Sequence, residues 1–384
     1  MPIPKSPAAE FLTMINVDDE THMSTALAMA EAGRFSTHPN PRVGAVVVQG
    51  GKVVGQGAHL RAGASHAEIF ALAEAGVAAT GATLYVTLEP CCHQGRTPPC
   101  TDAIIASGVK RVVIGMEDPN PLVSGKGVSA LRAAGVAVDG PCLPVAAAAL
   151  NPGFVSRMAR GRPWVRLKQA VSLDGKLALA SGESQWLTGK VAQEDVQKER
   201  AQASAILAGV GTVLADNPRL APRMEPAPWR YPVKIVLDSL LRTPADAALL
   251  QTPGEVWILH GESVQASHEK SALLRAGARL VAMEQDRYGR GIDLHHLMSV
   301  MAAREINEIL VEGGGRIATS LIEGGLVDEW LIYVAPLVLG ENALPFVSMG
   351  PYDSLAEIPR WRLEEVLHLG NDVKLRMYPL AKNR

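Results

Sequence analysis

Residues 66–100 decide the fold and chemistry expected of the first half of the chain. The stretch opens with His66-Ala-Glu68 and closes with Pro90-Cys91, eight further residues and Cys100. Zinc binds His nitrogen and Cys thiolate in tetrahedral sites, and a catalytic site leaves the fourth position to water. A neighbouring carboxylate can then move protons to and from that water. The stretch therefore predicts a zinc site with ligands His66, Cys91 and Cys100 and with Glu68 as the catalytic acid and base.

The spacing favours a catalytic role for Glu68 over a fourth ligand. Two residues on a helix are roughly 200° apart, so His66 and Glu68 can face one ion only if it lies beyond the helix end. Zinc deaminases of nucleobases use one His, two Cys and a Glu that is not a ligand, usually with Pro-Cys-x-x-Cys. Here the two cysteines lie nine positions apart, so the loop between them is longer.

Simpler interpretations of these residues remain open at this stage. The cysteines and His66 could form a structural zinc site, or buried thiols beside a hydrogen-bonded histidine. Cys92 could replace Cys91 as a ligand, although the strand-end sequence Glu89-Pro90-Cys91 favours Cys91. Cys142 has no partner nearby in the sequence and is expected to be a small buried apolar residue.

Composition excludes several classes of protein. The chain has 384 residues, 47% of them hydrophobic, and a net charge of −2 from 37 basic and 39 acidic residues. Nucleic-acid binding needs clustered excess Lys and Arg, which this balance lacks. No apolar run reaches the roughly 18 residues of a membrane span. Three of only four cysteines cluster at 91, 92 and 100, which favours metal binding in a reducing cytoplasm over disulfides.

The length predicts two α/β domains. Residues 1–20 contain Pro, Ser and Asp without an apolar core, and are expected to be a disordered extension rather than a signal peptide. The first domain is expected over 21–145, a linker rich in Ala and Pro over 146–163, and the second domain over 164–384. In the first domain, periodicity predicts helices near 22–32, 68–75, 99–107 and 128–134, and strands near 42–48, 53–57, 83–88, 111–115 and 136–138, a mixed sheet covered by helices.

The second domain shows a similar alternation of strands and helices. Strands are expected near 164–170, 205–209, 233–238, 255–260, 278–282, 308–312 and 328–338, and helices near 190–203, 295–304 and 316–323. A glycine loop, Gly313-Gly-Gly315, precedes the last of these helices. Such a loop lets backbone N–H groups approach a phosphate, although a plain tight turn is equally consistent. It is not G-x-G-x-x-G, so the usual dinucleotide fingerprint is absent.

Several longer motifs make the chain resemble the bifunctional deaminase–reductases of riboflavin biosynthesis, from about residue 22 to the end. The most specific is the long loop between the cysteines, with its Gly-Arg-Thr-Pro-Pro. Cys92 departs from the family pattern, which has a small polar residue there. The matching stretches are His38-Pro-Asn-Pro-Arg-Val-Gly44, His66-Ala-Glu68, Leu88-Glu-Pro-Cys-Cys-His-Gln-Gly-Arg-Thr-Pro-Pro-Cys100, Asp118-Pro-Asn-Pro121, Val171-Ser-Leu-Asp-Gly175, Ser181-Gly-Glu-Ser-Gln-Trp186 and Val311-Glu-Gly-Gly-Gly315.

The resemblance implies a cytidine-deaminase-like domain followed by a dihydrofolate-reductase-like domain. The first would use one Zn²⁺ to deaminate a pyrimidinone that carries a ribosylamino group and a 5′-phosphate. The second would use NADPH to reduce the ribosyl group to ribityl. The family also implies a homo-oligomer, a dimer or tetramer formed through the second domain.

The resemblance further implies contacts for both substrates and for NADPH, each of which could instead be structural. The residues placed near the pyrimidinone and its phosphate are Asn40, His93, Arg96, Thr97, Asp118 and Asn120. Those placed against NADPH are Ala170, Trp186, Thr212, Asp216, Ser239, Gly314, Gly315, Arg316, Ile317, Ala318, Thr319 and Ser320. Those placed against the reductase substrate are Ser184, Arg200, Leu220, Arg223 and Glu312, with Lys168 and Asp174 ranked lower.

Two other functions compete with this one. A deaminase of nucleic-acid bases would need a basic surface, which the charge balance argues against. A zinc-stabilised scaffold without activity would explain the cysteines but neither Glu68 nor the glycine loop, and removal of zinc would unfold it.

Overall fold

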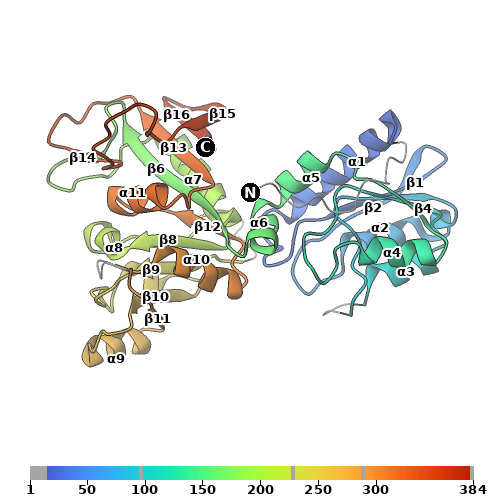
Figure 1. Cartoon of the computed structure of the whole chain (residues 1–384), viewed down its shortest axis with the longest axis horizontal. Helices are drawn as coiled ribbons and strands as arrows, with labels where there is room; N and C mark the ends of the chain where they lie inside the picture. Colours follow the sequence, from blue (N-terminus) through green and yellow to red (C-terminus); the bar gives the residue numbers. More distant parts are fainter. Residues whose placement is uncertain (1–14, 95–97, 226–229, 287–290, 381–384) are drawn as a thin grey trace. The chain divides into compact units, whose positions relative to one another are not determined.

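The structure, a computed structural model, describes residues 15–94, 98–225, 230–286 and 291–380. They form two compact units, and the chain passes from the first to the second between Arg160 and Gly161. Each unit has its own sheet (Figure 1), so the two are described separately. Within the described residues, no helix has the length and apolar character needed to cross a membrane.

The first unit is built on a five-stranded mixed sheet in the order β2-β1-β3-β4-β5. Strand β1 pairs antiparallel with β2 and β3, whereas β3, β4 and β5 run parallel. The parallel strands bring their carboxyl ends to one edge, where polar side chains can gather. The strand bounds are β1 Gly44–Gln49, β2 Lys52–Ala58, β3 Thr83–Val86, β4 Arg111–Ile114 and β5 Ala137–Asp139.

Helices cover both faces of this sheet, as the mixed pattern predicted. On one face, Ala45 and Val47 of β1 pack with α2, α3 and α4. On the other, Val46 and Val48 pack with Met23 of α1. Alternate residues of one strand thus enter opposite cores. The helices are α1 Val17–Ala30, α2 Ala67–Ala75, α3 Cys100–Ala106, α4 Lys126–Ala133, α5 Pro144–Leu150 and α6 Pro152–Arg160, with 3₁₀ turns at Glu31–Gly33 and Gly76–Ala79.

The first helix begins earlier than the expected extension over residues 1–20 allows. Helix α1 starts at Val17, where Asn16 and Asp19 form a reciprocal capping box. Asp19 is buried and also accepts hydrogen bonds from Tyr85 (2.8 Å) and Arg111 (2.7 Å). Residues 17–20 are therefore anchored helix, which corrects the expectation for them, while residues 1–14 lie outside the described part.

The expected linker over 146–163 is largely helical. Helices α5 and α6 occupy most of it and belong to the first unit. Asn151, between them, accepts a hydrogen bond from the backbone N–H of Arg42 (2.7 Å) and donates one to the carbonyl of the same residue (2.8 Å). The abundance of Ala and Pro in this stretch suggested a linker, but Ala is also the best helix former, and Pro opens both helices.

The second unit contains a nine-stranded sheet in the order β11-β10-β9-β8-β12-β6-β13-β16-β15. The seven strands from β11 to β13 are parallel, and β16 and β15 extend the sheet antiparallel. The bounds are β6 Trp164–Ser172, β8 Ala205–Gly209, β9 Val233–Leu237, β10 Val256–Gly261, β11 Arg279–Met283, β12 Glu308–Val311, β13 Glu329–Ala335, β15 Trp361–Leu369 and β16 Asp372–Pro379.

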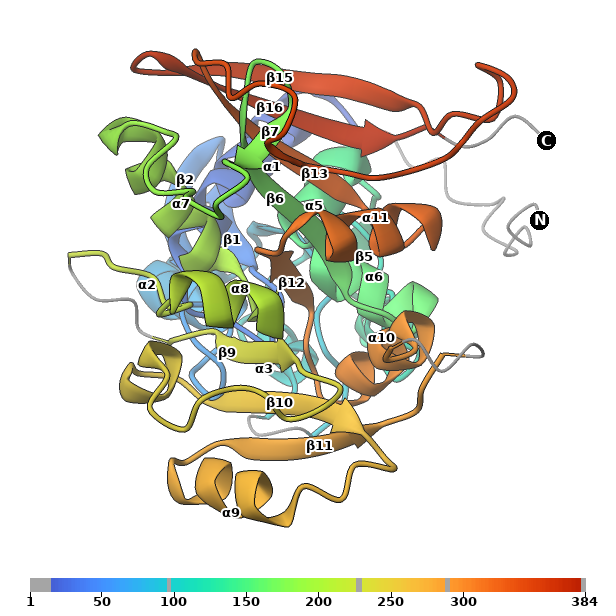
Figure 2. The same ribbon diagram turned by 90° about the vertical axis from the view of Figure 1, so that its left-hand side faces the viewer.

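Helices pack on both faces of this sheet, and Figure 2 shows α11 and α10 beside the central strands. A separate two-stranded ribbon pairs β7 Lys176–Ala178 with β14 Leu344–Pro345. The sequence predicted three of the helices and the seven parallel strands, but not α8, α9, the ribbon or the β15–β16 hairpin. The helices are α7 Lys190–Gln202, α8 Val210–Asp216, α9 Ser267–Arg275, α10 Leu294–Ala303 and α11 Gly315–Glu323, with a 3₁₀ turn at Ala248–Gln251.

A buried ionic cluster fixes α7 against the sheet. Glu199 of α7 is 4% exposed and forms ion pairs with Arg166 of β6 and Lys374 of β16. Lys374 also pairs with Asp195, one turn earlier on the helix, at 2.5 Å. Ion pairs to β6 and β16 therefore hold α7 in place, and with it the adjacent residue, Arg200.

Candidate active sites

The three predicted zinc ligands come together in the first unit. His66 is the N-cap of α2, Cys100 is the first residue of α3, and Cys91 lies beyond the carboxyl end of β3. Their ligand atoms all lie within 4.8 Å of one another. The His66 Nδ1 to Cys100 Sγ distance is 3.2 Å, and the His66 Nδ1 to Cys91 Sγ distance is 3.6 Å. One nitrogen and two sulfurs at this spacing fit a single zinc ion with one open position.

Glu68 lies beside this triad with one carboxylate oxygen uncommitted. It is 3% exposed, and among the described residues its Oε2 has no hydrogen-bond partner. Burial raises the pKa of Glu68. A buried carboxyl oxygen without a partner is costly unless something else occupies the space before it. The arrangement therefore fits a metal-bound ligand between Glu68 and the triad.

The triad also favours a thiolate at Cys91. Hydrogen bonds from Cys100 and from His66 lower the pKa of Cys91, and the backbone N–H of Cys100 lies 3.4 Å from its sulfur. Cys92 is only half-exposed and lies outside the triad, so Cys91 is the ligand candidate of the pair. Cys142 is a free, buried cysteine in the apolar cluster of α1, as expected.

Two of the predicted substrate contacts of this unit, Asn40 and Asp118, are connected to the triad by other residues. Asn40 lies 3.1 Å from His59, whose ring contacts the His66 ring edge-on at 5.2 Å. Asp118 is buried and accepts a hydrogen bond from the backbone of Asn120 (2.8 Å). Burial raises the pKa of Asp118 to about 6. The predicted contact His93 is exposed, and Arg96 and Thr97 lie outside the described residues.

Glu89, which no sequence motif marked as a site residue, organises the loop after β4. Its buried carboxylate accepts three backbone hydrogen bonds, from Asp118 (3.2 Å), Gly125 (3.0 Å) and Val128 (3.1 Å). Glu89 precedes the candidate ligand Cys91 by two residues, so it joins the metal site to the Asp118–Asn120 loop. An acidic residue between a buried strand and a Pro-Cys pair was the only signal in the sequence.

In the second unit, the predicted substrate residues Arg200 and Glu312 contact each other. The guanidinium binds both carboxylate oxygens, with Nε at 2.7 Å and the terminal nitrogen at 2.6 Å. Arg200 was expected to contact the reductase substrate, but its guanidinium is already bound by Glu312. Lys168 of β6 lies near this pair and over the Tyr333 ring, and burial lowers its pKa.

The loop that carries Leu220 and Arg223 is held against α7. The side chain of Gln197 accepts a hydrogen bond from the backbone N–H of Arg223 at 3.0 Å. Leu220 is buried, with a left-handed backbone at φ 46°. Ser184 donates to Asp216 at 3.0 Å, which joins a predicted substrate contact to a predicted cofactor contact. Gln197 was not anticipated, because its role depends on a residue 26 positions away.

The glycine loop divides into positions with different roles. Gly314, the N-cap of α11, has open space where a Cβ would lie. A Cβ on Gly315 would come within 2.6 Å of the Pro345 carbonyl, so packing alone requires glycine there. Thr319 accepts a hydrogen bond from the Ser348 N–H (2.9 Å), and Ala318 is fully buried. The side chain of Ala318 thus faces the core, so any cofactor contact there is through the backbone.

The remaining predicted residues flank the carboxyl ends of the parallel strands. Ala170 lies in β6, Thr212 in α8 after β8, and Ser239 two residues beyond β9. Trp186 is 65% exposed. Asp174 accepts hydrogen bonds from Ser172, Leu339 and Gly340, which gives it a structural role in the turn after β6.

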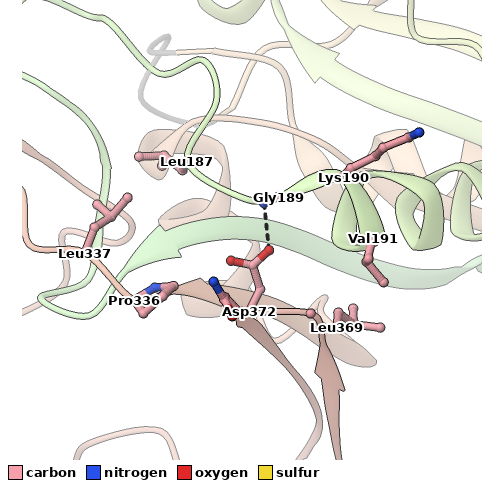
Figure 3. A pocket seen from close by; sticks show the side chains of 10 residues that line it. Leu187, Gly189, Lys190, Val191, Pro336, Leu337, Leu369 and Asp372 are labelled. Carbon is pink, nitrogen blue, oxygen red and sulfur yellow. Dashed lines mark hydrogen bonds between the residues drawn. The ribbon is translucent and has the colours of Figure 1, made fainter.

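A shallow pocket lies next to this edge, at the start of α7 (Figure 3). There Asp372 of β16 accepts a hydrogen bond from Gly189 at 2.7 Å. Its lining contains none of the residues predicted for either site. The lining residues are Leu187, Gly189, Lys190, Val191, Pro336, Leu337, Leu369, Gly370, Asn371 and Asp372.

Comparison with known proteins defines a two-domain enzyme, a zinc-dependent deaminase joined to a reductase. Residues 16–116 match the cytidine and deoxycytidylate deaminase zinc-binding region, and residues 163–375 match the RibD C-terminal domain. The chain is 44% identical to riboflavin biosynthesis protein RibD of Escherichia coli, over 94% of this chain and 99% of that protein. It is 42% identical to RibD of Aquifex aeolicus, over 94% and 98%.

Solved structures agree with these matches. RibD of Acinetobacter baumannii superposes with a TM-score of 0.87 at 38% identity, covering 95% of this chain and 99% of that one. The deaminase/reductase of Thermotoga maritima superposes with a TM-score of 0.81 at 32% identity, covering 94% and 99%. The chain belongs to the RibD family of riboflavin biosynthesis. The predicted fold class and the predicted pair of activities, deaminase and reductase, are thereby confirmed.

Proposed function

We propose that the first unit hydrolytically deaminates 2,5-diamino-6-ribosylamino-4(3H)-pyrimidinone 5′-phosphate with one zinc ion per chain. The observation that carries this proposal is the triad His66, Cys91 and Cys100 beside the uncommitted Oε2 of Glu68. The related Thermotoga maritima protein is named a diaminohydroxyphosphoribosylaminopyrimidine deaminase, which supports the choice of substrate.

Glu68 would carry the protons of this reaction. Zinc, when bound, would supply a water that loses its proton near neutral pH. The buried Glu68 carboxylate would hold a proton next to the reacting carbon and deliver it to the departing amino group. Its low exposure excludes bulk water, which strengthens its interaction with the reacting atoms.

Asn40, Asp118 and Asn120 would hold the pyrimidinone ring, since their neighbours His59 and Glu89 fix them next to the triad. The loop between the cysteines would hold the 5′-phosphate through His93, Arg96 and Thr97, whose donors suit phosphate oxygens. This part of the proposal rests on the family motif.

In the second unit, we propose NADPH as the reductant of 5-amino-6-(5-phosphoribosylamino)uracil. The predicted cofactor residues follow β6, β8, β9 and β12, whose carboxyl ends lie along one edge of the parallel sheet. Dinucleotides bind at such edges. The open space at Gly314 would let a phosphate approach the first N–H groups of α11.

The reductase substrate would lie against the polar cluster of Lys168, Arg200 and Glu312. NADPH, when bound, would supply the hydride to C1′ of the opened sugar. Arg200 would position Glu312, and Arg223, which is exposed on its braced loop, would bind the 5′-phosphate. Lys168 would then be the nearest cation to the sugar.

A coupled assay tests the whole proposal. The purified, zinc-loaded chain is given the ribosylamino-pyrimidinone phosphate and NADPH, and ammonia and NADPH are followed together. Ammonia release followed by NADPH oxidation is expected. Ammonia release without NADPH oxidation would refute the reductase assignment, and NADPH loss without any pyrimidine would refute the order of steps. The absence of both signals would refute the proposed substrate.

We also propose that the chain works in the cytoplasm as a homo-oligomer formed through its second unit. Strand β15 ends the nine-stranded sheet and is exposed over most of its length, including Leu363 (53%) and Val366 (49%). Edge strands of this kind pair with other chains. The four cysteines are free, which suits a reducing compartment. Sedimentation of the wild type against Leu363→Lys, with dissociation by the variant, tests the interface.

A further inference from the structure

Gln197 of α7 connects two parts of the candidate reductase substrate site. It is only 8% exposed. Its Oε1 accepts a hydrogen bond from the backbone N–H of Arg223 at 3.0 Å, and the same oxygen lies 3.5 Å from Nη1 of Arg200. Arg200 in turn binds both carboxylate oxygens of Glu312. One buried carboxamide thus joins the Arg200–Glu312 ion pair to the loop that carries Arg223.

The contacts of Gln197 determine which way its carboxamide points. Its Nε2 donates to the backbone carbonyl of Gln193 (3.1 Å), one turn earlier on the helix. A carbonyl can only accept and a backbone N–H can only donate, so the amide oxygen must be the atom that faces Arg223. Helix α7 is itself held to β6 and β16 by the ion pairs of Glu199. The acceptor for Arg223 is therefore oriented and rests on an anchored helix.

Hydrogen bonds hold the loop over residues 217–223 from two elements. Its first part is held by the segment 248–252, through bonds of 2.8 and 3.0 Å to Asn217 and Arg219. Within the described chain, the only hydrogen bond between this loop and α7 is the one that Gln197 accepts. Loss of that bond would leave the first part of the loop in place and release its last residue from the helix.

The guanidinium of Arg223 is available for a ligand. The residue is exposed, and among the described residues its side chain forms no hydrogen bond or ion pair. Partial burial and the nearby positive charges of Arg200 and Arg219 lower the pKa of Arg223, so three guanidinium groups lie near one another. A phosphate group would offset the repulsion among them, since Arg suits phosphate oxygens.

We propose that Gln197 is a positioning residue of the reductase, which ties the Arg223 loop to the Arg200–Glu312 pair and so directs the guanidinium of Arg223 to the 5′-phosphate of the substrate. The proposal rests on the function proposed above. The position requires a neutral acceptor, because a carboxylate there would pair with Arg200 and compete with Glu312. A carboxamide holds the loop and leaves the ion pair intact.

Two compounds separate positioning from packing. In NADPH oxidation by the full chain, KM is measured for 5-amino-6-(5-phosphoribosylamino)uracil, and the same compound without its phosphate is measured as a competitive inhibitor. Gln197→Met and Gln197→Leu remove the acceptor and leave side chains of two different shapes. Both are expected to raise KM for the phosphorylated substrate roughly tenfold, the value of one hydrogen bond, with a smaller change in kcat. The inhibition constant of the unphosphorylated compound and the Kd for NADPH should match the wild type.

A double substitution tests whether Gln197 acts through Arg223. Arg223→Gln removes the phosphate contact, so the addition of Gln197→Met to it should raise KM no further. Lys198→Met, at an exposed position on the same helix, is the matched control and should leave both constants unchanged.

The same measurements distinguish failure of the positioning role from failure of the proposed function. If Gln197→Met weakens the binding of both compounds alike, or if its effect adds fully to that of Arg223→Gln, Gln197 acts through packing alone and the proposal is overturned. A wild type that binds both compounds equally well would instead refute the phosphate contact of Arg223 in the proposed function, and the positioning role of Gln197 with it.

Discussion

The two candidate sites are assembled in different ways. The zinc triad uses His66, Cys91 and Cys100, which lie close together in the sequence, and leaves Glu68 Oε2 without a partner among the described residues. The reductase cluster joins Lys168, Arg200 and Glu312, which lie far apart in the sequence, and in it Arg200 and Glu312 already form an ion pair. We call the first site open, because Glu68 has an uncommitted oxygen, and the second closed, because its acid is held in an ion pair.

This difference predicts different responses to substitution. Removal of a group from the open site should abolish chemistry and leave folding intact, because little of the structure depends on that group. Removal of one partner from the closed site should damage stability together with chemistry, because the other charge is left buried. Substitutions at the two sites test this contrast.

Glu68→Gln tests the open site. The substitution preserves size and burial but removes the proton carrier, so ammonia release should fall roughly a thousandfold. Bound zinc, measured by metal analysis, and NADPH oxidation with deaminated substrate should remain at wild-type levels. Glu74→Gln, on the exposed side of the same helix, is the matched control and should stay fully active. Ammonia release by Glu68→Gln at the wild-type rate would refute the role of Glu68.

Glu312→Leu tests the closed site. It leaves Arg200 and Lys168 without their counter-charge, so the free energy of unfolding of the second unit should fall by about 3 kcal/mol, and reductase activity should be lost. All six tryptophans lie beyond residue 160, so tryptophan fluorescence during denaturant unfolding reports this unit alone. Deaminase activity should persist.

Two further variants show whether charge is the cause. Arg200→Met combined with Glu312→Leu should regain most of the stability but none of the reductase activity. Glu194→Gln breaks only an exposed pair with Lys190, in which the side chains are 63% and 89% exposed, so its stability should match the wild type. If Glu312→Leu is as stable as Glu194→Gln, the ion pair does not hold the site together.

The same contrast explains what the sequence could predict. The zinc triad was predictable because His66, Glu68, Cys91 and Cys100 are near one another and lie at the ends of regular elements. His59 and Glu89 were missed because their importance comes from contacts with Asn40 and the Asp118 loop. Arg200 and Glu312 were predicted as separate substrate contacts, since nothing in the sequence showed that they bind each other.

The secondary structure was likewise predictable only where the local sequence carries a pattern. Parallel strands such as β8 and β12 are buried on both faces and appear as short apolar runs, so their positions were predicted closely. Strand β15 is exposed over most of its length, and Glu365 interrupts its alternation of apolar residues, so the strand was not predicted. Helix α1 was placed too late because residues 18–22 are all polar, and its apolar periodicity begins only at Met23.

Acid titration should affect the two units in opposite directions. Burial raises the pKa of Asp118 to about 6, so the folded first unit binds this proton more tightly than the unfolded chain does. Its stability therefore falls as pH rises from about 4 to about 6, by on the order of 3 kcal/mol. Asp118→Asn should remove this dependence and stabilise the unit above pH 6. Hydrogen exchange of the β3 and β4 amides measures the stability of the first unit at each pH. The same pH dependence of exchange in Asp118→Asn would show that Asp118 is not its cause.

Glu199 should give the stability of the second unit the opposite pH dependence. Although burial raises its pKa, the charges of Arg166, Lys374 and Arg376 lower it to about 2 overall. Its contribution to stability is complete above the ordinary value of 4.5 and is lost as pH falls from there toward 2. In Glu199→Gln, tryptophan fluorescence should show a second unit that is less stable at pH 7 and whose stability changes less between pH 4.5 and 2.

One substitution in the glycine loop, where the second unit would bind its cofactor, should change stability least. Gly314 has an ordinary backbone, at φ −69°, and open space at its Cβ, so Gly314→Ala should change stability by less than about 1 kcal/mol. The added methyl group would lie in that space, and a phosphate held there should bind more weakly, which raises the Kd for NADPH in fluorescence titrations. Gly315→Ala should instead lower stability, because its Cβ meets the Pro345 carbonyl at 2.6 Å. An unchanged Kd in a stable Gly314→Ala variant would place the cofactor phosphates elsewhere on the sheet edge.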